Sequence, residues 1–83
     1  MDPVELYNLL APQPFRPVRV HLKDGRTYDI QSRQLAIVGV SWLDIGIPLP
    51  HEKRPIYDHV VRVWLNEIGK VEYLPASSSS AGG

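Results

Sequence analysis

Three histidines and one neighbouring aspartate are the residues of this chain whose types are best suited to chemistry. His21, His51 and His59 stand in separate parts of the sequence, and the chain has no cysteine. A metal site needs several ligands close together, which this spacing does not provide. Asp58 and His59 are adjacent in a predicted strand, so we expect their side chains to point to opposite faces rather than to form an acid–base pair. We expect His21 and His51 to face water and His59 to be half-buried.

Motifs for covalent or cofactor chemistry are absent from the sequence. The serines cluster in the C-terminal stretch PASSSSAGG, and no G-x-S-x-G, P-loop or dinucleotide fingerprint occurs. We therefore predict that the protein is not an enzyme and that it holds no cofactor or metal.

Charge provides a second class of candidate site, because five cations surround the first predicted hairpin and two carboxylates oppose them. The cations are Arg16, Arg19, Lys23, Arg26 and Arg33, and the carboxylates are Asp24 and Asp29. The cluster fits either an edge that faces phosphates or a solvated outer face with one cross-strand ion pair. We favour the solvated face, because charge patterns of this kind usually belong to a solvated surface. Nine basic and nine acidic residues also cancel over the whole chain, although a basic stripe on one face remains compatible with that balance.

Two tryptophans fall opposite the faces that we assign to the core. Trp64 has Val60 and Arg62 as neighbours on its face, and we predict that it lies in a subunit interface. For Trp42 the alternatives stay open: it stacks on a base, anchors an interface, or lies under the helix or the loop at 48–55.

Length and composition limit the class of protein. Eighty-three residues make one small domain whose core alone balances chain entropy only narrowly, so an oligomer is expected from the outset. The longest apolar run, 35–40, is too short to cross a bilayer. The N-terminal segment is acidic where a signal peptide would be basic, and the absence of cysteine is compatible with the cytosol. We expect a cytoplasmic protein without a membrane partner.

The N-terminal residues predict a short amphipathic helix. Asp2 can cap it, Pro3 suits its first position, and Glu5 follows the cap by three residues. The apolar positions on one face are Leu6, Leu9 and Leu10. Such a helix is too short to be stable alone, so we expect it to cover one end of a sheet and to end before Pro12.

The stretch VRVHLKDGRTYDI predicts a β-hairpin with a bulge. A two-residue loop would mix polar and apolar residues on both faces. A three-residue loop, Lys23–Gly25, instead places Val20 opposite Tyr28 on one face. The same register places Arg19 opposite Asp29 on the other face. The final glycine of the loop suits the left-handed conformation that this turn requires.

Further strands follow along the chain. LAIVGV and SWLDIGI are predicted as a second hairpin or as one strand bent at Gly39, and PLPHEKRP as a polar loop. IYDHVVRVWL is the longest predicted strand, NEIG is a tight or 3₁₀ turn, and KVEYL is a last strand with Val71 and Tyr73 on one side. We predict a mainly β fold: an N-terminal helix followed by a five-stranded, strongly bent antiparallel barrel at 1–75, and a disordered tail at 76–83.

This order of elements resembles the Sm-like family, the small barrels of RNA-associated ring proteins. The resemblance covers Pro3 to Pro75 and includes the helix, VRVHLKDGRTYDI in place of the family's first hairpin, and VVRVWLNEIGKVEYL in place of its last two strands. It implies homo-oligomeric rings, formed by pairing the fourth strand of one subunit with the fifth of the next, and binding of single-stranded RNA by loops that face the pore. The usual Asp and Asn of the family's first motif are missing from QSRQLAIVGVSW, and Asn66–Gly69 replaces the family's Arg-Gly or Lys-His turn.

Under this resemblance we assign two sets of candidate residues. The candidate RNA contacts are Arg33, Gln34, Asn66 and Lys70. The candidate subunit interface is Val60, Arg62, Trp64, Val71 and Tyr73. IYDHVVRVWL is too apolar to remain an unpaired edge, which favours assembly. The alternative is an SH3-like barrel that acts as a protein–protein adaptor without RNA binding; DNA is not an expected partner.

Overall fold

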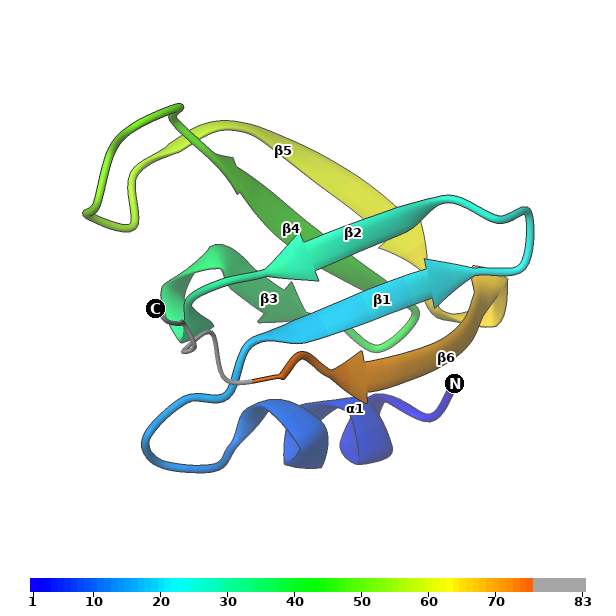
Figure 1. Ribbon diagram of the computed structural model, residues 1–83. Helices are drawn as coiled ribbons and strands as arrows, with labels where there is room; N and C mark the ends of the chain where they lie inside the picture. Colours follow the sequence, from blue (N-terminus) through cyan, green and yellow to red (C-terminus); the bar gives the residue numbers. More distant parts are fainter. Residues whose placement is uncertain (76–83) are drawn as a thin grey trace.

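The computed structural model describes residues 1–75, in which one helix precedes six strands (Figure 1). The predicted tail at 76–83 lies outside the described residues. The elements in chain order are helix α1 (Pro3–Leu10), strands β1 (Val18–Leu22) and β2 (Thr27–Ile30), 3₁₀ turn η1 (Arg33–Leu35), strands β3 (Ala36–Val38), β4 (Trp42–Pro48) and β5 (Tyr57–Trp64), 3₁₀ turn η2 (Leu65–Glu67) and strand β6 (Ile68–Tyr73).

The strands form two antiparallel sheets of three strands each. The first has the order β2-β1-β6 and the second the order β3-β4-β5. The mainly β fold with an N-terminal helix is therefore confirmed, but the five-stranded barrel is not: within residues 1–75 the strand pairing does not close. The physical reason is the polar segment at 31–34, where η1 interrupts strand pairing between Ile30 and Ala36 and separates β2 from β3.

The first hairpin has the register that its pattern predicts. Val18 lies opposite Ile30, and Arg19 lies opposite Asp29. The buried side chains of β1 alternate with half-buried ones, as expected of a strand with one face in the core. Gly25 has a φ of 97°, a left-handed conformation that side chains other than glycine rarely adopt.

The second hairpin joins β3 to β4 and turns tightly at Gly39. The Gly39 amide donates to the Trp42 carbonyl at 2.7 Å. A Cβ atom at Gly39 would lie 2.6 Å from the Trp42 ring, so only glycine lets the indole fold back over the turn. Of the two predicted alternatives, the hairpin is confirmed. β5 then pairs with β4 along its length, with Val63 buried opposite Leu43.

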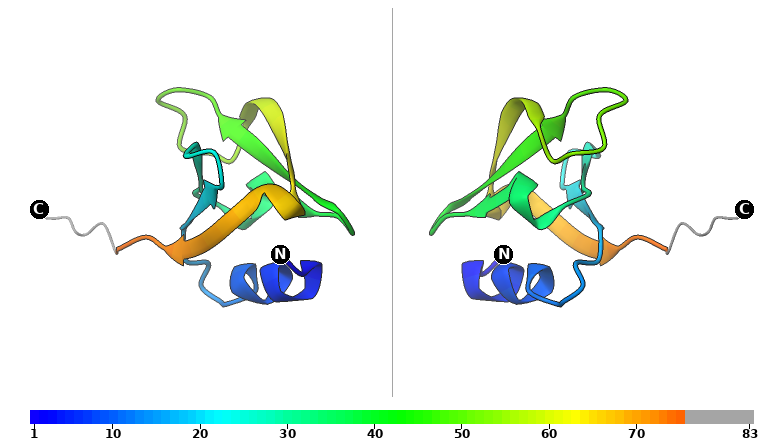
Figure 2. Two further views of the ribbon diagram at one scale, coloured as in Figure 1. Left: turned by 90° about the vertical axis from the view of Figure 1, so that its right-hand side faces the viewer. Right: turned by 90° about the vertical axis from the view of Figure 1, so that its left-hand side faces the viewer.

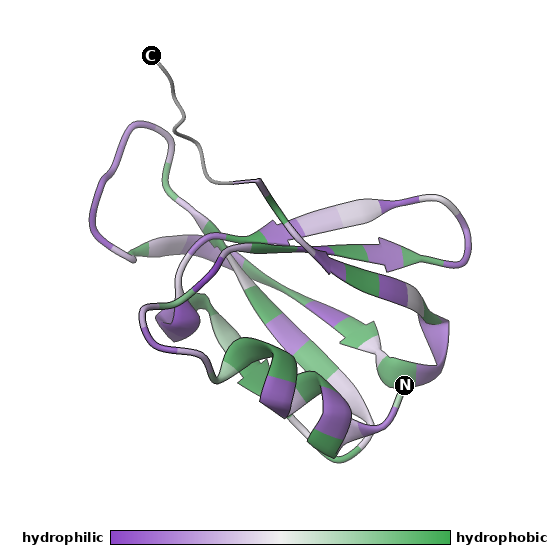
Figure 3. Cartoon of the chain, turned by 60° about the horizontal axis from the view of Figure 1, so that its bottom comes forward, coloured by the Kyte–Doolittle hydropathy of each residue, from purple (hydrophilic) through white to green (hydrophobic). Residues whose placement is uncertain are grey.

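Helix α1 lies beneath the strands (Figure 2), and hydrophobic segments alternate with hydrophilic ones along it (Figure 3). The Asp2 carboxylate accepts a hydrogen bond from the Val4 amide at 3.0 Å, and Pro3 takes the first helical position, as predicted. Leu6 and Leu10 are fully buried in the core, and Leu9 is half-buried. The buried apolar residues of both sheets join the helix in one cluster: Leu6, Leu10, Val18, Val20, Leu22, Ile30, Ala36, Leu43, Ile45, Val63, Leu65 and Ile68.

Candidate functional site

The outer edge of β5 carries large apolar side chains in contact with solvent. β5 pairs with β4 on one side only. Val60 is 49% exposed and Trp64 is 47% exposed, whereas alternate residues such as Val63 are buried. The backbone amide of Trp64 donates to the Glu67 carboxylate at 3.1 Å, which fixes the end of the strand at η2. This is the strand that the sequence predicts as an assembly edge.

The outer face of the same sheet holds a compact cluster of aromatic and charged groups. Trp42 and Trp64 lie opposite each other and meet edge to face, with ring centroids 6.4 Å apart. The Arg62 guanidinium lies 4.6 Å from the centre of the Trp42 ring. It also donates two hydrogen bonds to Asp44, at 2.8 and 3.0 Å, and these lower the pKa of Asp44. Trp42, for which the sequence left three alternatives, therefore packs beside Trp64 and Arg62 on this face.

Within residues 1–75 four strands have an open edge, β2, β3, β5 and β6, and the longest of them after β5 is β6, which pairs only with β1. Val71 and Tyr73 are half-buried and pack against the core from this edge. The Tyr73 hydroxyl donates to the Leu9 carbonyl at 2.8 Å, so it accounts for one of the carbonyls left free at the end of α1. The Arg16 guanidinium stacks 4.0 Å from the Tyr73 ring centre. Tyr73 thus joins the helix to the sheet while its ring lies next to an unpaired strand edge.

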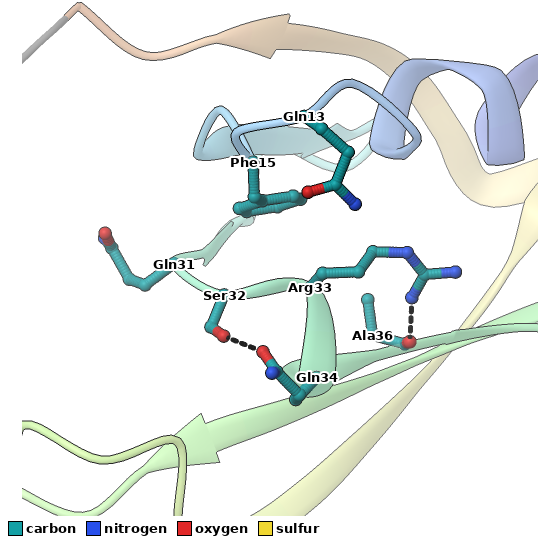
Figure 4. Close-up of a pocket in the computed structure, with 7 residues that line it drawn as sticks. All are labelled: Gln13, Phe15, Gln31, Ser32, Arg33, Gln34 and Ala36. Atoms are coloured by element: carbon teal, nitrogen blue, oxygen red, sulfur yellow. Dashed lines mark hydrogen bonds between the residues drawn. The ribbon is translucent and has the colours of Figure 1, made fainter.

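A polar surface groove of about 560 Å³ lies between the segment after α1 and the segment around η1 (Figure 4). Gln13 and Phe15 stand on one side of it and Ser32, Arg33 and Gln34 on the other. The groove combines an aromatic ring, amide groups and a guanidinium, which can stack on a planar ring and exchange hydrogen bonds with its edge.

Arg33 is held in a fixed position at this groove. It donates a hydrogen bond to the Ala36 carbonyl at 2.7 Å, and its guanidinium lies 5.6 Å from the Tyr7 ring centre. The Ser32 hydroxyl donates to the Gln34 side chain. These contacts preorganise the polar wall of the groove.

The candidate RNA contacts do not come together in the folded chain. Arg33 and Gln34 share the groove. Asn66 instead lines a shallow depression beside Trp64, and Lys70 lies opposite His21 on the outer face of the first sheet. Sequence reasoning missed Gln13 and Phe15. The proline-rich segment that contains them has no periodicity. Its one signal in the sequence is a glutamine and a phenylalanine close to the end of the helix.

Ion pairs occupy two of the five cations around the first hairpin, Arg19 and Arg26. Arg19 donates two hydrogen bonds to Asp29, at 2.8 and 3.0 Å, and Arg26 donates to Asp24 at 2.8 Å. The Arg19 hydrogen bond lowers the pKa of Asp29 below its ordinary value, and the backbone amide of Arg26 does the same for Asp24. These contacts match the predicted solvated face with a cross-strand pair, Arg19–Asp29.

The histidines show one clear error of prediction. The Nδ1 atom of His59 lies 3.0 Å from the Asp58 carboxylate, although adjacent strand residues were expected to point apart. Both side chains are more than half exposed at the start of β5, where a register shift near Pro48 disturbs the regular alternation. His59 is therefore exposed rather than half-buried. His21 contacts Glu72 at 2.5 Å on the outer face of the first sheet, and this hydrogen bond lowers the pKa of Glu72.

The described residues contain neither a cluster of metal ligands nor a helix that could span a membrane. In the part of the chain that the structure describes, residues 1–75, histidine, aspartate and glutamate side chains do not gather in groups of three or more around a point that could hold a metal ion. The one α-helix in this part is too short to span a membrane.

Comparison with known proteins adds no relative to this description. No family model matches the chain, and neither a curated protein nor a solved structure matches it. The features of the molecule that bear on function are therefore the open edges of β5 and β6 and the groove.

Proposed function

We propose that this protein is a non-enzymatic, Sm-like module whose copies assemble by pairing β5 of one copy with β6 of the next. The observation that carries this proposal is the open edge of β5, an eight-residue strand with Val60 and Trp64 about half exposed. Soluble proteins usually protect such an edge by charge, by a covering segment or by pairing, because it otherwise recruits other strands.

The order of the strands supports the same arrangement. η1 connects β2 of the sheet β2-β1-β6 to β3 of the sheet β3-β4-β5. In each sheet the longer of the two edge strands is β6 or β5, respectively. The Sm-like pattern suggested by the sequence joins subunits through the two strands that correspond to these. The small size of the chain gives a second reason. A domain of 83 residues buries a small core, so the area buried between copies would add to its stability.

The native mass of the intact protein tests this proposal. We expect a defined multiple of the 9.4 kDa chain mass at micromolar concentration. Trp64→Arg should shift the mass to that of the single chain, because a charged side chain is costly to bury in an apolar contact. Val4→Arg is the matched control: it also replaces an exposed apolar residue, but on the outer side of α1, and should leave the assembly intact.

Two results would contradict the proposal. One is a wild-type protein that remains a single chain at micromolar concentration, which would favour the SH3-like adaptor, a module that binds other proteins through the same exposed side chains. The other is a folded Trp64→Arg variant whose mass equals that of the wild-type assembly.

We further propose single-stranded RNA as the ligand of the assembled module. The groove with Phe15, Arg33 and Gln34 supports this proposal, since single-stranded RNA is bound by stacking and by hydrogen bonds to base edges. Titration with labelled oligo-U and oligo-A should show binding that weakens as salt rises. Arg33→Ala should weaken it, and Arg26→Ala, which removes a cation already paired with Asp24 at the hairpin tip, should not. A flat titration with both oligonucleotides would exclude RNA while leaving the assembly proposal in place.

A further inference from the structure

The backbone groups that face the open edge of β5 belong to Val60 and Arg62. The Leu65 amide donates to the Ser41 carbonyl at 2.9 Å, in the same register as the β4–β5 pairs. Because backbone groups alternate sides along a strand, the odd-numbered residues of β5 turn theirs toward β4. The even-numbered residues turn theirs outward, and the Trp64 amide is already bound to Glu67.

On β6 the pattern is the reverse. The Leu74 amide donates to the Pro17 carbonyl at 2.9 Å, in the register of the β1–β6 pairs. Lys70 and Glu72 therefore turn their backbone groups toward β1. Val71 and Tyr73 turn theirs to the open edge, although their side chains face the core.

These two facts restrict how one copy can join another. In an antiparallel pair, residues that exchange hydrogen bonds lie directly opposite each other and have their side chains on the same face. Val60 and Arg62 must then lie opposite Val71 and Tyr73 of the neighbour. The outward side chains of β5 consequently meet the inward side chains of the neighbour's β6, so apolar groups from both copies share one face.

We propose that a second copy of this chain adds its β6 antiparallel to β5 in the register that sets Val60 opposite the neighbour's Tyr73 and Arg62 opposite the neighbour's Val71. This inference rests on the proposed function, because it specifies the contact through which the copies assemble. It pairs the regular part of β6, 70–73, with 60–63 of the first copy, and Gly69 beyond it is the extra residue of a bulge in β6. Trp64 then reaches the neighbour's Gly69, which is exposed and has no side chain to obstruct the ring.

The adjacent registers are poorer matches. A shift by two residues in one direction sets Asp58 opposite the half-buried Tyr73 and leaves Trp64 beyond the end of β6. A shift in the other direction leaves only three residue pairs, because β5 ends at Trp64. A shift by one residue also fails. It sets residues of β5 whose backbone groups face the neighbour opposite residues of β6 whose backbone groups face β1, so they cannot exchange hydrogen bonds. In the proposed register, by contrast, Val60 and Trp64 are covered and Arg62 keeps its ion pair with Asp44.

Cysteine pairs test this register, and the chain offers a clean background because it has no cysteine of its own. The proposed pairing sets Val61 directly opposite the neighbour's Glu72, at a spacing that a disulfide can bridge. On mild oxidation, the double variant Val61→Cys with Glu72→Cys should therefore form covalent dimers and larger species. Val61→Cys with Lys70→Cys is the matched control, with its second cysteine two residues away on the same strand. Arg62→Cys with Glu72→Cys sets its cysteines on opposite faces. Both controls should remain single chains on a denaturing, non-reducing gel.

The native mass of each reduced variant separates the two levels of the proposal. If the reduced variants are assembled but a control pair crosslinks in place of the 61/72 pair, the register is wrong and the assembly proposal stands. If the wild type and the reduced variants are all found to be single chains, both proposals are wrong. Crosslinking confined to the 61/72 pair in an assembled protein supports both.

Discussion

At the scale of single residues, Gly25 shows most directly how the sequence determines local structure. Its φ of 97° lies where a β-branched residue is strained, and no atom outside its chain neighbours approaches within 4 Å of a Cβ built on it. Gly25→Val should therefore lower the free energy of unfolding by about 1 kcal/mol or more through backbone strain alone. Gly25→Asn, which tolerates positive φ better, should lower it less. Equal melting temperatures for wild type and Gly25→Val would contradict the bulged turn.

Single residues also mark the limit of what alternation can predict. Arg19 and Asp29 pair as the pattern requires, because they lie in the regular middle of a hairpin. Asp58 and His59 do not point apart, because they lie at the start of β5 next to a register shift. The alternation of side chains along a strand predicts which face of the sheet each occupies only where the backbone is regular. The sequence carries no clear signal for the register shift near Pro48.

At the scale of elements, α1 depends on its contacts with the strands. Leu6 is fully buried and Val4, on the other side of the helix, is 64% exposed. Leu6→Ala should lower the free energy of unfolding by about 2–5 kcal/mol, through lost burial and the cavity it leaves. Val4→Ala should change it by less than about 0.5 kcal/mol. Chemical denaturation of both variants measures the difference, and similar losses for the two would show that the helix does not pack as described.

The elements that sequence could define are those with caps, turns or alternation. The helix start at Asp2 and the turn at Gly25 each have a specific residue requirement, and both are predicted correctly. The separation of β2 from β3 could not be predicted, because the polar segment at 31–34 fits a bent strand as well as a 3₁₀ turn. The groove was also missed in part, since Gln13 and Phe15 come to Arg33 only through the tertiary fold.

At the scale of the whole molecule, the central claim is that the open edges of β5 and β6 pair with each other between copies. Within the described residues, each of these strands has a partner on one side only. The folded chain buries a small core and leaves Val60 and Trp64 half exposed at one edge, with Val71 and Tyr73 half-buried at the other. Sequence alone indicated the apolar edge, but only the backbone hydrogen bonds identify which residues can join across it.

Hydrogen exchange, measured residue by residue in the wild type and in Trp64→Arg, tests this claim most directly. The amides of Val60, Arg62, Val71 and Tyr73 face the open edges, and the proposed pairing between copies should protect them. They should exchange slowly in the assembled wild type and rapidly in Trp64→Arg, while the amide of Val63 stays protected in both. Rapid exchange of all four amides in an assembled wild-type protein would contradict the claim.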